Sequence, residues 1–219
     1  MTVVGIVPAG GSGERLGAGG PKAFVALADK QLYEWSVDAL LDACDHVIVA
    51  VPSESPVPSR QSPGLEFVPG GESRSESVRN ALLAAPEAHI VVVHDAARPL
   101  VTSELVQACV DALEPGVDGA IAAARMTDTV KEAAPDGRVV RTLDRSSLWR
   151  IQTPQVFRAD VLREALDRDI TALAAATDDA SLVEQMGRSV KVVEAPPDNM
   201  KVTSEADFRV AEALLRERV

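Results

Sequence analysis

Short, continuously apolar segments that alternate with helical patterns constrain the fold of this chain more than any other sequence feature. The helical patterns span residues 32–44, 73–85, 103–113 and 204–218, and residues 53–64 form a loop rich in Ser and Pro. Strands without a polar face are typical of parallel sheets that carry helices on both sides. The pattern therefore predicts a three-layer α/β fold, with buried strands at residues 3–7, 46–51, 65–68, 89–93 and 119–124.

Length and composition limit the class of protein. With 219 residues, 46% of them hydrophobic and 25% charged, the chain is expected to form a single domain over residues 1–219. No apolar segment approaches the roughly 18 residues of a membrane helix, so no membrane partner is expected. The net charge of −11 argues against a nucleic-acid partner. Cys44 and Cys109 lack metal-ligand spacing, and both are expected to be buried thiols in a reducing compartment, the cytoplasm.

A polar hairpin interrupts the α/β pattern at about residues 125–148. Residues 127–131 and 138–143 are extended segments of mixed polarity, and the intervening Ala134-Pro135-Asp136-Gly137 sequence is typical of a turn. The hairpin is too polar to belong to the core. The pattern leaves two interpretations open, a solvated surface excursion or an arm that packs on another subunit.

The loop after the first strand carries the clearest indication of a bound anion. Four glycines lie between Gly10 and Gly17, at the carboxyl end of a strand, where open α/β sheets bind phosphates. The dinucleotide fingerprint fails because Leu16 stands where its third glycine would be, and the sequence has no Walker Gly-Lys-Ser/Thr triplet. Arg15 and Lys22 add two cations to this loop, a combination that suits phosphoryl or nucleotidyl transfer.

A second group of polar residues follows the strand at residues 89–93. Asp95 could bind a sugar hydroxyl or a metal, and Arg98 could bind a phosphate; alternatively, the two only pair with each other or cap the next helix. His94 is expected to be a packed residue at the strand end. The glycine pair at residues 70–71 precedes another helix, and this junction is either a plain turn with an N-cap or a helix N-terminus that holds a base edge or a phosphate.

Eight segments, spread over nearly the whole chain, carry motifs that are informative together. They are residues 8–16 with Pro21-Lys22, Gly70-Gly71-x-x-Arg74, residues 93–99, residues 128–131, Asp144-Arg145-x-x-Leu148-Trp149, residues 153–155, Thr177-Asp178-x-Ala180-Ser181 and Asn199-x-Lys201-Val202-Thr203. In this order the segments resemble the motifs of the 2-C-methyl-D-erythritol 4-phosphate cytidylyltransferase family of the non-mevalonate isoprenoid pathway. This resemblance implies a Rossmann-like nucleotidyltransferase fold with a protruding β-arm that builds a homodimer.

The resemblance also implies a reaction, in which CMP passes from CTP to methylerythritol phosphate by in-line attack of the acceptor phosphate on the α-phosphorus. Mg²⁺ would be held mainly by the CTP phosphates, and no protein ligand is assigned to it. The implied catalytic residues are Arg15, Lys22, Arg145 and Lys201, and the implied CTP-binding residues are Ala9, Gly10, Gly11, Gly71, Ser77 and Ala96. The implied acceptor contacts are Asp95, Arg98, Thr129 and Thr153, with Thr129 and Arg145 reaching the partner subunit's site.

Two positions depart from the family's pattern. Gly10 replaces the second Ala of the usual Pro-Ala-Ala-Gly loop, and Glu72 replaces the Asp that commonly follows the double glycine. The nearest alternative is a cytidylyltransferase that acts on ribitol 5-phosphate, which would share the fold and CTP and differ in residues 127–153. A nucleotidyltransferase that uses another base and a non-catalytic nucleotide-binding regulator are further alternatives; the motifs argue against the first, and the retained cations argue against the second.

Overall fold

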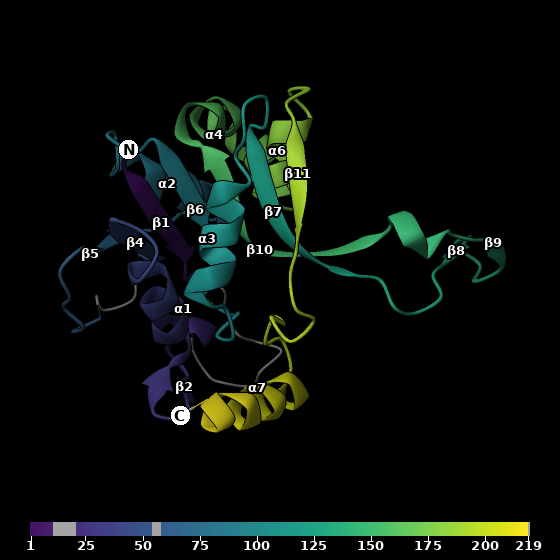
Figure 1. Cartoon of the computed structure of the whole chain (residues 1–219), viewed down its shortest axis with the longest axis horizontal. Helices are drawn as coiled ribbons and strands as arrows, with labels where there is room; N and C mark the ends of the chain where they lie inside the picture. The colour runs from purple at the N-terminus through teal and green to yellow at the C-terminus, as the bar shows by residue number, and fades with distance from the viewer. Residues whose placement is uncertain (11–20, 54–57, 219) are drawn as a thin grey trace.

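A seven-stranded sheet forms the middle of the molecule (Figure 1). The computed structural model describes residues 1–10, 21–53 and 58–218. The strand order across the sheet is β11-β7-β10-β6-β1-β4-β5. The strands are β1 (Val3–Pro8), β4 (His46–Val51), β5 (Leu65–Pro69), β6 (Ile90–Val93), β7 (Gly119–Arg125), β10 (Trp149–Arg158) and β11 (Val190–Glu194).

Most neighbouring strands of this sheet are parallel, as the apolar segments predict. β1 pairs with β4 and β6, β4 pairs with β5, and β7 pairs with β11, all in parallel. β10 is antiparallel to both β6 and β7, and it is a strand that the apolar segments do not predict. The sequence of β10 is polar and contains Pro154, which is unfavourable inside a central strand. The pairing with β7 is irregular between Ile151 and Gln155, and the proline lies within this irregular stretch.

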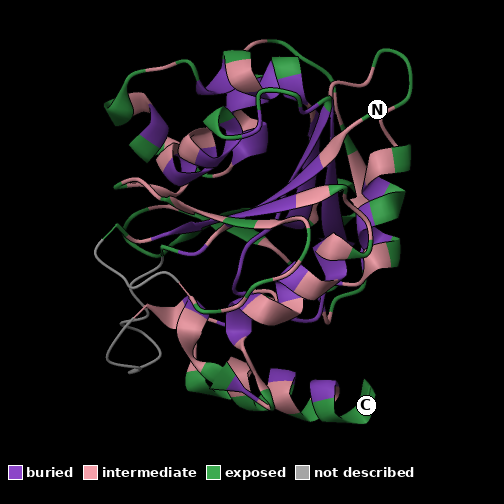
Figure 2. Ribbon diagram, turned by 90° about the vertical axis from the view of Figure 1, so that its left-hand side faces the viewer, coloured by how far each residue is buried: buried purple, intermediate pink, exposed green. Residues whose placement is uncertain are grey.

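Helices cover both faces of the sheet, which confirms the three-layer α/β prediction. α1 and α3 pack on one face, and α2, α4 and α6 pack on the other. Side chains alternate along β1, so Val4 and Ile6 join one core cluster and Val7 joins the other. Figure 2 shows the buried strands between these helices. The helices are α1 (Leu32–Leu41), α2 (Arg74–Leu83), α3 (Ser103–Asp111), α4 (Ala159–Leu166), α5 (Ile170–Ala175), α6 (Asp179–Glu184) and α7 (Glu205–Arg218).

The C-terminal helix α7 packs against loops at the carboxyl edge of the sheet, apart from the two helical layers (Figure 1). Ala211 and Leu215 of α7 are buried in a third apolar cluster with Leu100 and Val202. A short hairpin of β2 (Ala26–Leu27) and β3 (Lys30–Gln31) precedes α1 and contributes to the same cluster. Because Val202 is buried there, α7 holds the segment around residue 202 in place.

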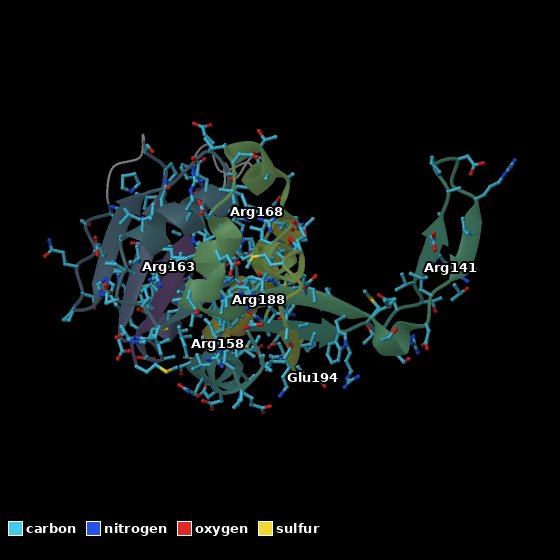
Figure 3. The ribbon with its side chains drawn as sticks, turned by 90° about the horizontal axis from the view of Figure 1, so that it is seen from above. Arg141, Arg158, Arg163, Arg168, Arg188 and Glu194 are labelled. Atoms are coloured by element: carbon cyan, nitrogen blue, oxygen red, sulfur yellow. The ribbon has the colours of Figure 1, made fainter. Side chains whose placement is uncertain are left out.

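The predicted hairpin projects from the body of the molecule as an arm, defined here as residues 126–148 (Figures 1 and 3). It leaves β7 and returns into β10, and its two strands are β8 (Lys131–Ala133) and β9 (Val139–Thr142). Every residue of both strands is exposed, including Val139 and Val140. At its base, the Arg125 guanidinium lies 4.5 Å from the ring centroid of Trp149.

The two cysteines are free thiols that pack in the same apolar cluster. Cys109 is buried as expected, whereas Cys44 is only partly buried, because it follows the end of α1, so the expectation of burial is wrong for Cys44. Burial raises the pKa of both thiols to about 12. Among the described residues, no helix is both long and apolar enough to cross a membrane.

Candidate active site

Two pockets open near the carboxyl ends of the parallel strands and share one wall. The first pocket, of about 330 Å³, is lined by residues that follow β1, β5 and β6. The second pocket, of about 320 Å³, is lined largely by β10 and by the segment that precedes α6. Arg74, Asp95 and Lys201 line both pockets and are called the shared wall below. Ligands in the two pockets would meet at these three side chains.

The first pocket gathers the predicted nucleotide-binding residues from three separate loops. Gly11 and Arg15 lie outside the described residues. The N-terminus of α2 also borders this pocket, and its N-cap Ser73 accepts a hydrogen bond from the Glu76 N–H at 3.2 Å. Backbone amides at a helix N-terminus favour anions. Besides Asp95 and Lys201 of the shared wall, the predicted residues that line this pocket are Ala9, Gly10, Lys22, Gly71, Ser77 and Ala96.

Ser77 holds the glycine turn between β5 and α2. Its hydroxyl accepts a hydrogen bond from the Gly71 N–H at 3.0 Å and donates one to the Ser73 carbonyl at 2.9 Å. A Cβ on Gly70 would lie 3.0 Å from the Ser77 hydroxyl, which explains a glycine there. A Cβ on Gly10 would meet nothing among the described residues closer than 3.9 Å. Among the described residues, the departure at Gly10 therefore leaves room for a Cβ beside the pocket.

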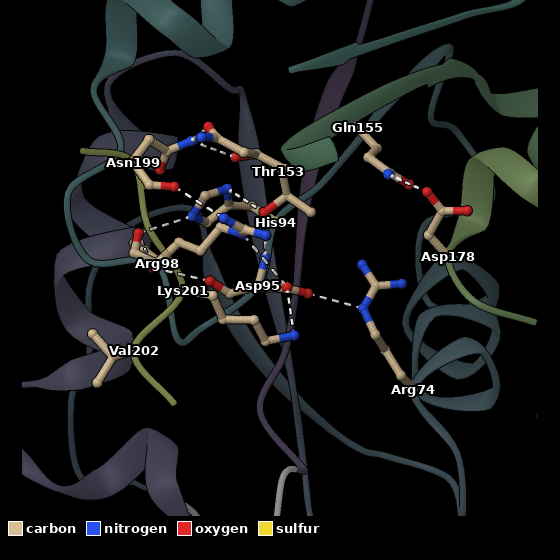
Figure 4. Close-up of polar contacts among 12 residues, drawn as sticks. Arg74, His94, Asp95, Arg98, Thr153, Gln155, Asp178, Asn199, Lys201 and Val202 are labelled. Atoms are coloured by element: carbon tan, nitrogen blue, oxygen red, sulfur yellow. Dashed lines mark hydrogen bonds and ion pairs between the residues drawn. The ribbon is translucent and has the colours of Figure 1, made fainter. Parts of the chain in front are cut away.

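Asp95 lies at the centre of the shared wall and is surrounded by cations (Figure 4). One carboxylate oxygen is 2.9 Å from Arg74 Nε, and the other is 2.9 Å from Lys201 Nζ and 3.7 Å from Arg98 Nε. Burial opposes ionisation of Asp95, but the charges of Arg74 and Lys201 outweigh it and hold its pKa well below the usual range. The interpretation in which Asp95 and Arg98 pair only with each other is therefore wrong, because Arg74 and Lys201 are closer.

Arg74 joins Asp95 to a second carboxylate that the sequence does not single out. Its guanidinium also donates to Asp179 Oδ2 at 2.6 Å, and the Asp179 side chain is fully buried. Burial raises the pKa of Asp179, and the charge of Arg74 opposes that rise. Asp179 Oδ1 has no hydrogen-bond partner among the described residues. Arg74 thus connects Asp95 to Asp179 at the start of α6.

His94 is a packed residue, as predicted, and it orients its neighbours. Its Nε2 lies 3.1 Å from the Arg98 carbonyl and its Nδ1 lies 3.0 Å from the Thr153 hydroxyl. Burial lowers the pKa of His94 to about 4, so the ring is neutral at pH 7. A neutral ring that donates from Nε2 accepts at Nδ1, so the Thr153 hydroxyl donates to it. The same hydroxyl accepts a hydrogen bond from the Asp95 N–H at 3.0 Å.

The second pocket contains two of the predicted acceptor contacts besides Asp95, namely Arg98 and Thr153. Thr153 is buried, and its hydroxyl already donates to His94 and accepts from the Asp95 N–H. Thr153 therefore holds the backbone of Asp95 in place, and its hydroxyl oxygen can accept one further hydrogen bond. Arg98 donates to the Asn199 carbonyl at 2.9 Å, while its Nε has no hydrogen-bond partner within the described chain. Across the pocket, Gln155 Nε2 donates to Asp178 Oδ2 at 2.8 Å (Figure 4).

Lys22 and Lys201 are brought close together although 179 positions separate them in the chain. Lys22 belongs to a 3₁₀ turn (Lys22–Phe24), and its ammonium donates to the carbonyl of Val202, the residue that follows Lys201. Buried Asn199 anchors the same segment by donating to the Gln152 side chain at 2.8 Å and to the Thr153 carbonyl at 2.9 Å. The two predicted catalytic lysines therefore share one side of the site.

Two predicted site residues lie away from these pockets. Thr129 and Arg145 belong to the arm, and neither lines the first or the second pocket. Arg145 begins a 3₁₀ turn (Arg145–Ser147), and its guanidinium donates to the Thr127 carbonyl. The described part of the chain contains no group of three His, Cys, Asp or Glu side chains that could hold a metal ion. Residues of this chain therefore do not form a metal site of their own within that part.

Comparison with known proteins identifies the relatives of this chain. The family model of 2-C-methyl-D-erythritol 4-phosphate cytidylyltransferase matches residues 3–217. Curated proteins of that name from Saccharopolyspora erythraea and Nocardia farcinica are both 42% identical, over 98% and 99% of this chain and 100% and 95% of theirs. The crystal structure of the Thermus thermophilus protein of that name has a TM-score of 0.84 at 33% identity, covering 99% of this chain and 100% of that one.

Proposed function

Since this chain belongs to the 2-C-methyl-D-erythritol 4-phosphate cytidylyltransferase family, we infer that it transfers CMP from CTP to methylerythritol phosphate and releases pyrophosphate. The reaction is a nucleotidyl transfer. The observation that carries the proposal is the pair of adjacent pockets with Arg74, Asp95 and Lys201 between them. Two substrates that exchange a group at phosphorus require such adjacency.

We propose that the first pocket binds CTP and the second binds the acceptor. An oxygen of the acceptor phosphate then forms a bond to the α-phosphorus of CTP at the shared wall. The bond from that phosphorus to the oxygen bridging it to the β-phosphorus breaks, and pyrophosphate leaves with both electrons of that bond. The nucleotide can approach the backbone closely at Gly10 and Gly71, and the N-terminus of α2 borders the same pocket with its backbone amides.

The catalytic contribution that we propose is electrostatic. Lys22, together with Arg15, stabilises the charge on the triphosphate, while Lys201 and the partner subunit's Arg145 position the attacking phosphate. The second pKa of a phosphate monoester is about 6, so at pH 7 the attacking phosphate is already largely deprotonated. No general base is then required, which agrees with the neutral, buried state of His94.

Asp95 has a distinct role in this proposal, because it holds cations that a phosphate also attracts. Lys201 lies 2.9 Å from Asp95, so the acceptor phosphate has to compete with that carboxylate for the ammonium group. Asp95 retains Arg74 and Arg98 when Lys201 turns to phosphate. Before the acceptor binds, Asp95 therefore compensates the positive charge of Lys201. After the acceptor binds, Arg74 and Arg98 still compensate the negative charge of Asp95.

The remaining elements of the proposal concern the metal, the assembly and the location. We propose that Mg²⁺ enters with CTP as its triphosphate complex, because the described residues offer no metal cluster and Asp95 is engaged with cations. The arm, whose strands are fully exposed, packs on a second copy of the chain and carries Thr129 and Arg145 to the partner's pockets. Two free thiols are typical of a reducing compartment, which supports a cytoplasmic location.

Pyrophosphate release tests the proposed reaction. The purified protein is incubated with CTP and Mg²⁺, and in parallel with methylerythritol 4-phosphate, ribitol 5-phosphate or no acceptor. Release with methylerythritol phosphate alone is the expected result. Release with ribitol phosphate alone would preserve the chemistry and refute the acceptor. The absence of release with either acceptor would refute the reaction.

A further inference from the structure

The second pocket contains one hydrocarbon side chain in a wall that is otherwise polar. Of the described residues that line this pocket, Ile151 alone has a purely aliphatic side chain, and it is 40% exposed. Single exposed apolar residues are ordinary on protein surfaces. The distinguishing feature of Ile151 is its position, because it faces a ligand pocket in which its neighbours are charged or hydrogen-bonding groups.

The backbone fixes where Ile151 lies. It belongs to β10 and pairs with Ala123 of β7, just before the irregular stretch that leads to Gln155. The next residue, Gln152, is buried and is held by Asn199 at 2.8 Å and by the Pro196 carbonyl at 3.3 Å. A β-branched side chain has few rotamers. Ile151 therefore presents a rigid apolar surface to the pocket.

The chemistry of the acceptor matches this arrangement, if the proposed function is correct. Methylerythritol 4-phosphate carries its phosphate on C4, hydroxyls along the chain and one methyl branch on C2. The phosphate has to reach the shared wall, so the carbon chain extends toward residues that line only the second pocket. There the Gln155–Asp178 pair suits hydroxyls, whereas Ile151 suits a methyl group.

We propose that Ile151 recognises the C2 methyl branch of the acceptor and is the residue that favours it over unbranched polyol phosphates. The proposal rests on the proposed function, since it concerns the same pocket. One additional methyl group against an apolar surface discriminates between substrates by roughly tenfold or somewhat more. An unbranched acceptor does not make that contact, so its kcat/KM is lower by this factor alone. Ile151 therefore affects the choice of acceptor and not the chemical step.

The test compares two acceptors that differ only in the branch, methylerythritol 4-phosphate and erythritol 4-phosphate. The wild-type kcat/KM is expected to favour the methylated acceptor by about tenfold. Ile151→Ala and Ile151→Thr are expected to reduce this ratio to about threefold or less by lowering kcat/KM for the methylated acceptor only. Ile151→Val should retain the preference. Ile170→Ala is the matched control, because Ile170 is 54% exposed on α5, outside both pockets.

The outcomes separate the two proposals. If the wild type uses methylerythritol phosphate but Ile151→Ala and Ile151→Thr keep its full preference for the branch, the role of Ile151 is overturned while the function stands. If the folded wild type releases no pyrophosphate with methylerythritol phosphate, the proposed function fails and the role of Ile151 fails with it. Circular dichroism of each variant verifies folding, which an exposed position should preserve.

Discussion

Replacing Arg74 by methionine should destabilise the protein in a way that depends on pH. The variant keeps an unbranched apolar stem but removes the guanidinium that bridges Asp95 and Asp179. Asp95 retains Lys201 at 2.9 Å. Asp179 loses its cation while its side chain remains fully buried. The perturbation therefore leaves one carboxylate in the interior without a counter-charge.

The size of the effect follows from this burial. Removing one partner of a buried ion pair costs about 3–5 kcal/mol, mainly because the other charge stays buried. Because the Arg74 side chain is 27% exposed, solvent weakens its interaction with Asp179. We therefore expect a loss of unfolding free energy at the lower end of this range, about 3 kcal/mol at pH 7. The double variant Arg74→Met/Asp179→Asn should recover about half or more of this loss, because no charge is left behind.

The pH dependence has a definite sign. Without Arg74, burial and the negative charges of Asp95 and Asp178 raise the pKa of Asp179 in the folded state above the unfolded value. The folded variant then binds more protons than the unfolded chain, so its stability falls as pH rises. For a single proton the change is at most about 1.4 kcal/mol per pH unit, or about 2.7 kcal/mol between pH 5 and pH 7. The variant should therefore be closer to wild type at pH 5.

Urea denaturation followed by circular dichroism at pH 5 and pH 7 measures both effects. Arg188→Met is the matched control, since Arg188 pairs with Glu164 at 2.9 Å where both side chains are more than 40% exposed, and it should destabilise the protein far less than Arg74→Met. A deficit for Arg74→Met as small as that of the control would refute the reasoning. A deficit that grows toward acid would refute the assigned state of Asp179.

Three further predictions concern activity and assembly. Lys22→Ala should lose at least about 3 kcal/mol of transition-state stabilisation, measured as kcat/KM for pyrophosphate release, and wild-type turnover would disprove its role. Deletion of residues 133–138 should weaken the proposed dimer, so a variant that still sediments as a stable dimer would contradict the role of the arm. Gly10→Ala should change kcat/KM less than about threefold, because a Cβ there meets nothing among the described residues closer than 3.9 Å; a larger loss would mean that the nucleotide needs that space.

The apolar segments were sufficient to predict the parallel core, whereas the strand that builds the acceptor pocket was not recognised. Residues of β1, β4 and β6 are buried on both faces, so their hydrophobicity reports their position directly. β10 carries Gln152, Thr153 and Gln155 into the interior because each is hydrogen-bonded there. Polar side chains whose hydrogen bonds come only from tertiary contacts leave no periodic pattern in the sequence, and a proline such as Pro154 is unfavourable inside a central strand.

The bridge from Arg74 to Asp179 was missed for a related reason. Their positions differ by 105 residues, and no spacing rule connects two side chains that meet only when α2 and α6 reach the same sheet edge. The resemblance included Arg74 and the neighbouring Asp178, which was the only available signal. The lysines and the glycine turns were recognised because each is informative locally, as a cation or a flexible residue beside a strand end.

The protein has a negative net charge, whereas its site is rich in cations, and the buried carboxylates of Asp95 and Asp179 compensate part of the positive charge of the site. The chain has a net charge of −11, yet Lys22, Arg74, Arg98 and Lys201 converge on the two pockets. Such a cluster would repel itself in the absence of substrate if Asp95 and Asp179 did not lie among the cations. A bound phosphate replaces part of that compensation at Lys201, so the cations bind the anionic substrates without having to be assembled at each turnover.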